Sequence, residues 1–283
     1  MAEYAGDAAI TNLGVETLAG LIINGGRATL RAAAANAGAP AVLVAALRNH
    51  ARVPNLVYWT CMILSALAEE KVGPERVHAV LEAGAPAAIV ATLQTSIRPV
   101  DGHAVQACCN ALYVLAGSSA GRDAIIEAGG AAALVAAARA VPKIEVAHGT
   151  CRALALIATA PLGIAATVEA GATATAVACL QAHTDSPEVA ASASWLLWNL
   201  AAGSRVSKEA ALRLGAVAAL TAALAAYPTK DSVINNATGA LKSLTDLKDD
   251  TPAGDSGAPR KPEEAAGAIP SGASAAGVDA ASA

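Results

Sequence analysis

One stretch of the chain, residues 190–201, combines an aromatic and an amide side chain at a spacing suited to recognition. It holds two of the three tryptophans in a chain that has no phenylalanine. Trp195 and Asn199 are four residues apart, so they share one face if the stretch is a helix. Such a pair can bind another molecule but cannot catalyse a reaction by itself.

Catalytic chemistry has few candidates in this sequence. The motifs G-x-S-x-G and H-E-x-x-H are absent, and no Gly-rich loop suggests phosphate binding. His183 and Asp185 could hold a metal weakly, but a solvated turn is the simpler interpretation. The other histidines are scattered, at His50, His78, His103 and His148. We therefore predict a protein that is not an enzyme, with no cofactor, no metal and no small-molecule substrate.

The charge balance argues against a nucleic-acid partner. The chain has 19 basic and 23 acidic residues, a net charge of −4. Six of the acids and two of the bases lie in residues 249–283, which leaves 17 of each in the rest of the chain. A nucleic-acid binder presents a strongly basic surface, so we expect other proteins as partners.

The positive mean hydropathy of +0.47 raises the question of a membrane span. The best candidate, residues 161–182, is interrupted by Glu169 and Gln181, and a span needs about 20 apolar residues. The start, Met-Ala-Glu-Tyr, lacks the features of a secretory signal. Five cysteines without a C-x-x-C pair indicate buried thiols in a reducing compartment. We expect no membrane span and a cytoplasmic location, with the nucleus or a cilium as alternatives.

The strongest pattern is an internal repeat marked by glycine. An Ala-Gly or Leu-Gly step interrupts a helical pattern five times, with intervals of 46, 45, 42 and 44 residues. The marker glycines are Gly38, Gly84, Gly129, Gly171 and Gly215. A proline follows later in every unit, where a further helix is expected to begin; these are Pro54, Pro99, Pro142, Pro187 and Pro228. The pattern thus predicts three helices in each unit, and the first of them ends at the marker glycine.

The third predicted helix of each unit aligns closely when Trp195 is the reference position. Two residues further on, every unit has leucine: Leu64, Leu112, Leu154, Leu197 and Leu241. One residue before, the units have Cys61, Cys109, Cys151, Ser194 and Thr238. These offsets predict a buried stripe that includes the cysteines and leaves the Trp195 position facing outward. A single unit cannot bury its own stripe, so the units must stack into a solenoid.

The three-helix unit, the turn around Gly84 (Glu-Ala-Gly-Ala-Pro) and the stretch around Trp195 resemble the armadillo repeat. The resemblance implies an all-α fold, a right-handed α-solenoid of about five armadillo-type repeats. We expect degenerate capping helices in residues 1–26, with Gly14 at the marker position, and a disordered Gly/Pro/Ala/Ser-rich acidic tail at 249–283. The units of the solenoid (27–248) are about 27–70, 71–118, 119–160, 161–203 and 204–248.

The resemblance also implies that the third helices line a concave groove for extended or helical segments of partner proteins. In armadillo proteins that bind peptides, Trp and Asn at the Trp195 and Asn199 positions contact the peptide, and here only the fourth unit has both. The candidate groove residues are Tyr58, Trp59, Gln106, Asn110, Tyr113, His148, Arg152, Trp195, Trp198, Asn199, Asn235 and Asn236.

Several alternatives stay open at this point. Trp59 and Trp198 could be wedged between units as core residues, and Asn199 could cap the end of a neighbouring helix. The scaffold could be an adaptor that binds segments in its groove. It could instead be an architectural subunit of a large ciliary, cytoskeletal or organellar assembly, which contacts its partners through convex surfaces and ends.

Overall fold

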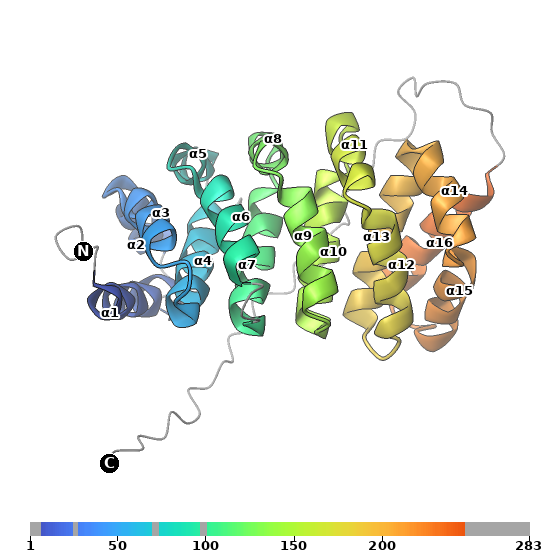
Figure 1. Cartoon of the computed structure of the whole chain (residues 1–283), viewed down its shortest axis with the longest axis horizontal. Coiled ribbons are helices and arrows are strands. Elements are labelled where there is room, and N and C mark those ends of the chain that lie inside the picture. Colours follow the sequence, from blue (N-terminus) through green and yellow to red (C-terminus); the bar gives the residue numbers. More distant parts are fainter. Residues whose placement is uncertain (1–6, 25–27, 70–73, 97–100, 247–283) are drawn as a thin grey trace, which may run out of the picture.

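The computed structural model describes residues 7–24, 28–69, 74–96 and 101–246. Within these ranges all regular structure is helical, with sixteen α-helices (α1–α16) and one short π-helical segment, η2 (Gly20–Asn24). Figure 1 shows them stacked into one elongated array, with α1 and α2 at one end and α14 to α16 at the other. The predicted disordered tail lies outside the described residues.

After η2 the helices follow one another in threes. The first helices are α2 (Ala28–Asn36), α5 (Pro74–Glu82), α8 (Ser119–Glu127), α11 (Pro161–Glu169) and α14 (Arg205–Arg213). The second helices are α3 (Ala39–Asn49), α6 (Ala85–Ser96), α9 (Gly130–Ala140), α12 (Ala172–Ala182) and α15 (Ala216–Ala226). The third helices are α4 (Pro54–Ala68), α7 (Gly102–Leu115), α10 (Ile144–Ile157), α13 (Pro187–Gly203) and α16 (Asp231–Thr245). The prediction of an all-α array of three-helix units is confirmed.

The marker glycines all adopt a left-handed backbone conformation, with φ between +74° and +81°. In the third unit the Gly129 N–H donates to the carbonyl of Ile126 (2.9 Å), which closes the first helix, and the second helix begins at the next residue. Glycine has no Cβ and adopts positive φ at little cost. The predicted end of each first helix at its glycine is therefore correct.

The third helices pack against one another in order along the array. The stripe predicted to be buried is buried in the first four units, where Leu64, Leu112, Leu154 and Leu197 are each fully enclosed, with no measurable exposure. In the fifth unit the prediction is wrong, because Leu241 is only half-buried and Thr238 is exposed. Burial of these side chains between units is the main hydrophobic contribution to the fold.

The N-terminal prediction needs a correction. Helix α1 (Ala8–Ala19) runs straight through Gly14, so this glycine is not a marker turn. The helix begins at Asp7, whose side chain accepts from the backbone N–H groups of Ala9 and Ile10. Because α1 packs against α4 as each third helix packs against the next, it occupies the place of a third helix. Gly14 lies inside a continuous helix rather than at its end, so its sequence context misleads.

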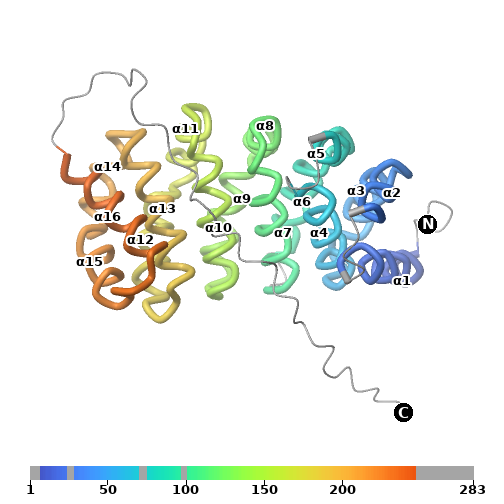
Figure 2. Tube along the Cα trace, turned by 180° about the vertical axis from the view of Figure 1, so that it is seen from behind, coloured from blue at the N-terminus to red at the C-terminus, as the bar shows by residue number. Residues whose placement is uncertain are grey.

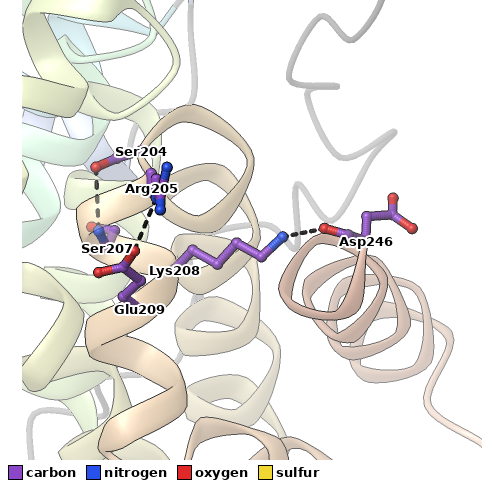
Figure 3. Close-up of polar contacts among 6 residues, drawn as sticks. All are labelled: Ser204, Arg205, Ser207, Lys208, Glu209 and Asp246. Carbon is purple, nitrogen blue, oxygen red and sulfur yellow. Dashed lines mark hydrogen bonds and ion pairs between the residues drawn. The ribbon is translucent and has the colours of Figure 1, made fainter. Parts of the chain in front are cut away.

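In the last unit, side-chain hydrogen bonds cap the first helix and join it to the end of the third helix, as Figure 3 shows. The Ser204 hydroxyl caps α14 by accepting from the Ser207 N–H (3.2 Å). Further along the same helix, the Lys208 ammonium donates to the carbonyl of Asp246, directly after the end of α16. A cation at a helix C-terminus complements the helix dipole, so Lys208 ties the first helix of this unit to its third.

Over the described part of the chain, no single helix is both long and apolar enough to cross a membrane. Four pairs of consecutive first and second helices reach that length and composition only when taken together, and each pair is bent by 57° to 73°.

We predict that Gly129→Ala destabilises the array by about 1–2 kcal/mol, because an L-residue is strained at positive φ. A Cβ at Gly129 would meet no atom within 4 Å, so the loss comes from the backbone alone. Gly129→Asn should lose less, since asparagine tolerates this conformation better. Urea denaturation followed by circular dichroism measures both, and an unchanged midpoint for the alanine variant would contradict the prediction.

Candidate functional site

The candidate site is the surface formed by the third helices. Figure 2 views the array from the side opposite to Figure 1, with α4, α7, α10, α13 and α16 following one another along it. We call the exposed and half-buried side chains of these five helices the third-helix face. The predicted groove residues lie on these helices, but the structure assigns them different environments.

At the N-terminal end of this face, Tyr58 and Trp59 are half-buried and contact each other edge to face, with ring centroids 5.0 Å apart. They line a shallow hollow of about 220 Å³ together with residues from the first turns of α4 and α7, namely Pro54, Asn55, Asp101 and His103. Sequence reasoning did not include these four residues. A comparison of the first turns of successive third helices, which the helix alignment left out, could have found them.

A second cluster joins α7 and α10. The Arg152 guanidinium carbon lies 3.6 Å from the centroid of the Tyr113 ring, a cation–π contact. Arg152 Nη1 also lies 3.4 Å from His148 Nε2, one turn earlier on α10. The opposite ring nitrogen of His148, Nδ1, is 3.0 Å from the backbone carbonyl oxygen of Glu188 in the first turn of α13. This chain of contacts joins three consecutive third helices.

The electrostatics of this cluster favour a neutral imidazole. Burial and the neighbouring Arg152 charge lower the pKa of His148, against smaller opposing effects of Glu188. In the neutral form His148 Nδ1–H donates to the Glu188 carbonyl and Nε2 accepts from Arg152, so both contacts are satisfied together. The imidazole thus acts as a fixed support for the guanidinium.

Gln106 and Asn110, on α7, are half-buried. Asn110 lies against α10 at Gly149, where an added Cβ would be 3.0 Å from Asn110 Oδ1. Gly149 therefore lets α10 approach α7 closely enough for the amide to fit between the helices.

The predicted outward orientation of Trp195 is wrong. Its side chain is only 4% exposed, and its indole N–H is buried without a hydrogen-bond partner. The prediction treated α13 as an isolated helix, whereas α10 and α16 pack along its two flanks and cover this position. The Trp195 side chain is therefore part of the core between units.

Asn199 is also buried, at 5% exposure. Its Nδ2 donates to the carbonyl oxygen of Ala155 over 2.8 Å. Ala155 carries one of the last four carbonyl groups of α10, which have no partner within an α-helix. The alternative that Asn199 caps a neighbouring helix end is correct, and its donor is already used inside the protein.

The remaining candidates lie on α13 and α16. Trp198 is half-buried and packs against Gly239, where an added Cβ would be 2.6 Å from the indole ring. Asn236 is half-buried, and its Nδ2 donates to the Ala191 carbonyl (2.9 Å), whereas Asn235 is exposed. The possibility that Trp198 is wedged between units is thus partly correct, since its ring packs on α16 but stays partly accessible.

The cysteines are all buried and free of disulfides. Burial raises the pKa of Cys109 to about 12, and a side-chain contact with Cys61 (Sγ–Sγ 3.7 Å) raises that of Cys108. A thiol of raised pKa is a poor nucleophile at neutral pH. The prediction that Cys61, Cys109 and Cys151 fill the core is confirmed. Within the described ranges, no group of three or more His, Cys, Asp or Glu side chains is placed to hold a metal ion.

We predict that Asn199→Ala lowers the free energy of unfolding by about 1–3 kcal/mol, because it leaves the buried Ala155 carbonyl without a donor. The matched control is Asn235→Ala, an exposed amide on α16, which should stay within about 0.5 kcal/mol of the wild type. Urea denaturation of the three proteins provides the comparison. Equal stability of the two variants would show that the cap contributes nothing.

We predict that His148 makes the array less stable in acid. Its folded-state pKa is lowered, so the unfolded chain binds a proton that the folded chain resists. Stability is therefore intact above the ordinary histidine pKa of about 6.5 and falls as the pH drops below it. The loss of stability between pH 7.5 and pH 5 should be smaller in His148→Gln than in the wild type. His103→Gln, at an exposed position on α7, serves as control. An equal loss of stability between pH 7.5 and pH 5 in both variants would refute the assignment of the acid sensitivity to His148.

A comparison with protein-family models finds no match, and neither does one with curated proteins. Solved structures match along most of the array. An engineered protein superposes with a TM-score of 0.71 at 25% identity, covering 84% of this chain and 93% of that chain. Computationally designed armadillo repeat proteins for modular peptide recognition give a TM-score of 0.67 at 25% identity, covering 81% of this chain and 91% of that chain.

A designed armadillo repeat protein in complex with the peptide (KR)4 matches with a TM-score of 0.65 at 23% identity, over 82% of this chain and 91% of that chain. These matches agree with the three-helix units and with the row of third helices. The chain therefore has the armadillo-repeat fold.

Proposed function

We propose that this protein is a non-catalytic scaffold that binds segments of partner proteins on its third-helix face. The designed armadillo proteins of similar structure include ones made for peptide recognition and one in complex with a peptide. This likeness supports a protein partner, and the side chains of the chain itself indicate where that partner binds.

One observation carries the proposal: several large side chains left partly accessible on the third-helix face are of the types that dominate protein interfaces. They are Tyr58, Trp59, Tyr113, Arg152 and Trp198, all half-buried. Trp, Tyr and Arg are enriched at interface hot spots because they supply large contact area with a polar group attached. Half-burial holds each side chain in place before binding, which reduces the entropy lost on association.

The other parts of the proposal follow from the same environments. The raised pKa values of the buried thiols Cys108, Cys109 and Cys151 make these three poor nucleophiles, in keeping with a role that is not enzymatic. The contact with Cys151 lowers the pKa of Cys179, which is also buried. Free cysteines also suit a reducing compartment. We accordingly propose the cytoplasm as the place of action, with the nucleus or a cilium as alternatives.

A second candidate function, an architectural subunit, is favoured by the ends of the array. Ile10, Leu13 and Leu21 are 45%, 66% and 55% exposed at one end. At the other end Leu212 and Leu214 are 44% and 43% exposed. Apolar side chains that gather on a surface mark contact sites. An architectural subunit would use these ends, whereas an adaptor would use the third-helix face.

We predict that Trp59→Ala/Arg152→Ala reduces recovery of bound partners at least fivefold in affinity purification with mass spectrometry, because it removes two interface-type side chains. Both side chains are half-buried, so circular dichroism must first show that the variant is folded.

The matched control, Leu13→Ser/Leu214→Ser, removes apolar side chains from the two ends and should leave recovery unchanged. The opposite result, with partners lost only in the end variant, would reject binding on the third-helix face and support the architectural role. Equal recovery of partners with the wild type and both variants would reject both binding on the third-helix face and the architectural role.

A further inference from the structure

Charges are distributed unevenly along the third helices from α4 to α16. Every carboxylate within these helices lies in a first turn: Glu145, Glu188 and Asp231. Beyond the first turns, the five helices contain no acidic residue and two basic ones that are charged at any physiological pH, Arg152 and Lys242. The middle of the third-helix face is therefore weakly positive, although the chain as a whole has a net charge of −4.

Arg152 lies at the centre of this strip, on the third of the five helices. Among the residues that the structure describes, the ion pairs within 4.0 Å join other side chains, such as Arg31 with Glu69 and Arg205 with Glu209, and Arg152 is in none of them. Its hydrogen-bond contact within the protein is Nη1 with the neutral His148. A half-buried guanidinium has lost part of its hydration, and here no carboxylate of the described chain forms an ion pair with it within 4.0 Å.

The guanidinium is also held in one orientation. Tyr113 covers one face of the planar group at 3.6 Å, and His148 fixes one edge. Within the described residues, no acceptor engages the N–H groups of Nε and Nη2. A fork of parallel N–H groups matches the two oxygens of a carboxylate. Since the fork is ordered before binding, little side-chain entropy is left to lose.

We propose that the third-helix face selects partner segments that carry an aspartate or glutamate, whose carboxylate accepts hydrogen bonds from Arg152. This inference rests on the proposed function, because it names the chemistry of the segment bound there. Tyr113 and His148 are the positioning residues that orient the guanidinium. A nucleic-acid strand is a poorer fit, since its phosphates need several cations in a row and this strip holds one central guanidinium.

The test begins with a random 12-residue peptide library displayed on phage and selected against the full chain. The wild type should enrich peptides with Asp or Glu at one position, and Arg152→Gln should enrich peptides without that preference. Arg213→Gln, which removes an exposed guanidinium from α14, is the matched control and should keep the acidic preference.

A double-mutant cycle then locates the contact. One selected peptide and its Glu→Gln version are labelled and titrated with the wild type and with Arg152→Gln by fluorescence anisotropy. The Glu→Gln change should weaken binding to the wild type roughly fivefold or more and leave binding to Arg152→Gln nearly unchanged. Because the change in the peptide does not touch the protein, the result holds even if Arg152→Gln is less stable.

The outcomes separate this inference from the proposed function. If the wild type selects peptides without an acidic preference, or if Arg152→Gln keeps that preference, the Arg152 assignment is overturned and the third-helix face remains a binding surface. If the wild type selects no peptide at all, both the assignment and peptide binding on this face are overturned. Preferential binding of an equally labelled single-stranded DNA would also overturn the assignment.

Discussion

The structure depends on one constraint: a three-helix unit cannot bury its own apolar stripe and must use the next unit to do so. The leucines at the centre of this stripe, such as Leu112 and Leu154, are fully enclosed only because a third helix lies on either side. Within the described residues α16 has a third helix on one side only, and its Leu241 is half-buried. The row of third helices is therefore both the main packing interface of the array and the support of its candidate binding surface.

The features that could be predicted from the sequence are those that depend on the local geometry within one unit. A glycine that ends a helix at positive φ is a local requirement of the backbone, and it recurs in all five units. The alignment of the stripe along one side of each third helix also follows from helical geometry. The same reasoning failed at Gly14, since α1 starts at the cap Asp7 and continues past the glycine. A marker residue has its meaning only when the elements before and after it are present.

The candidate site was harder to predict, because the environment of a groove position is decided by neighbouring helices. Trp195 and Asn199 share a face of α13, as their spacing requires, but α10 and α16 cover that face. The carbonyl that Asn199 satisfies belongs to a residue 44 positions earlier in the chain. The contact between Arg152 and Tyr113 likewise joins two helices. Periodicity within one helix contains no information about how closely the next helix approaches.

The position of Trp195 in the repeat is held by Asn110, Arg152 and Gly239 in three other units, and these contacts give it a different role in each of the four. Asn110 packs on Gly149, Arg152 stacks on Tyr113, Trp195 is enclosed in the core, and Gly239 makes room for Trp198. A surface that repeats the same side chain can bind a peptide backbone in register along its whole length. This surface instead presents one oriented guanidinium flanked by separate aromatic groups, so under the proposed function its selectivity would come from the side chains of the bound segment. Recognition of that kind concentrates the binding free energy at a few positions, and the proposal assigns one such position to the central unit, which carries Arg152.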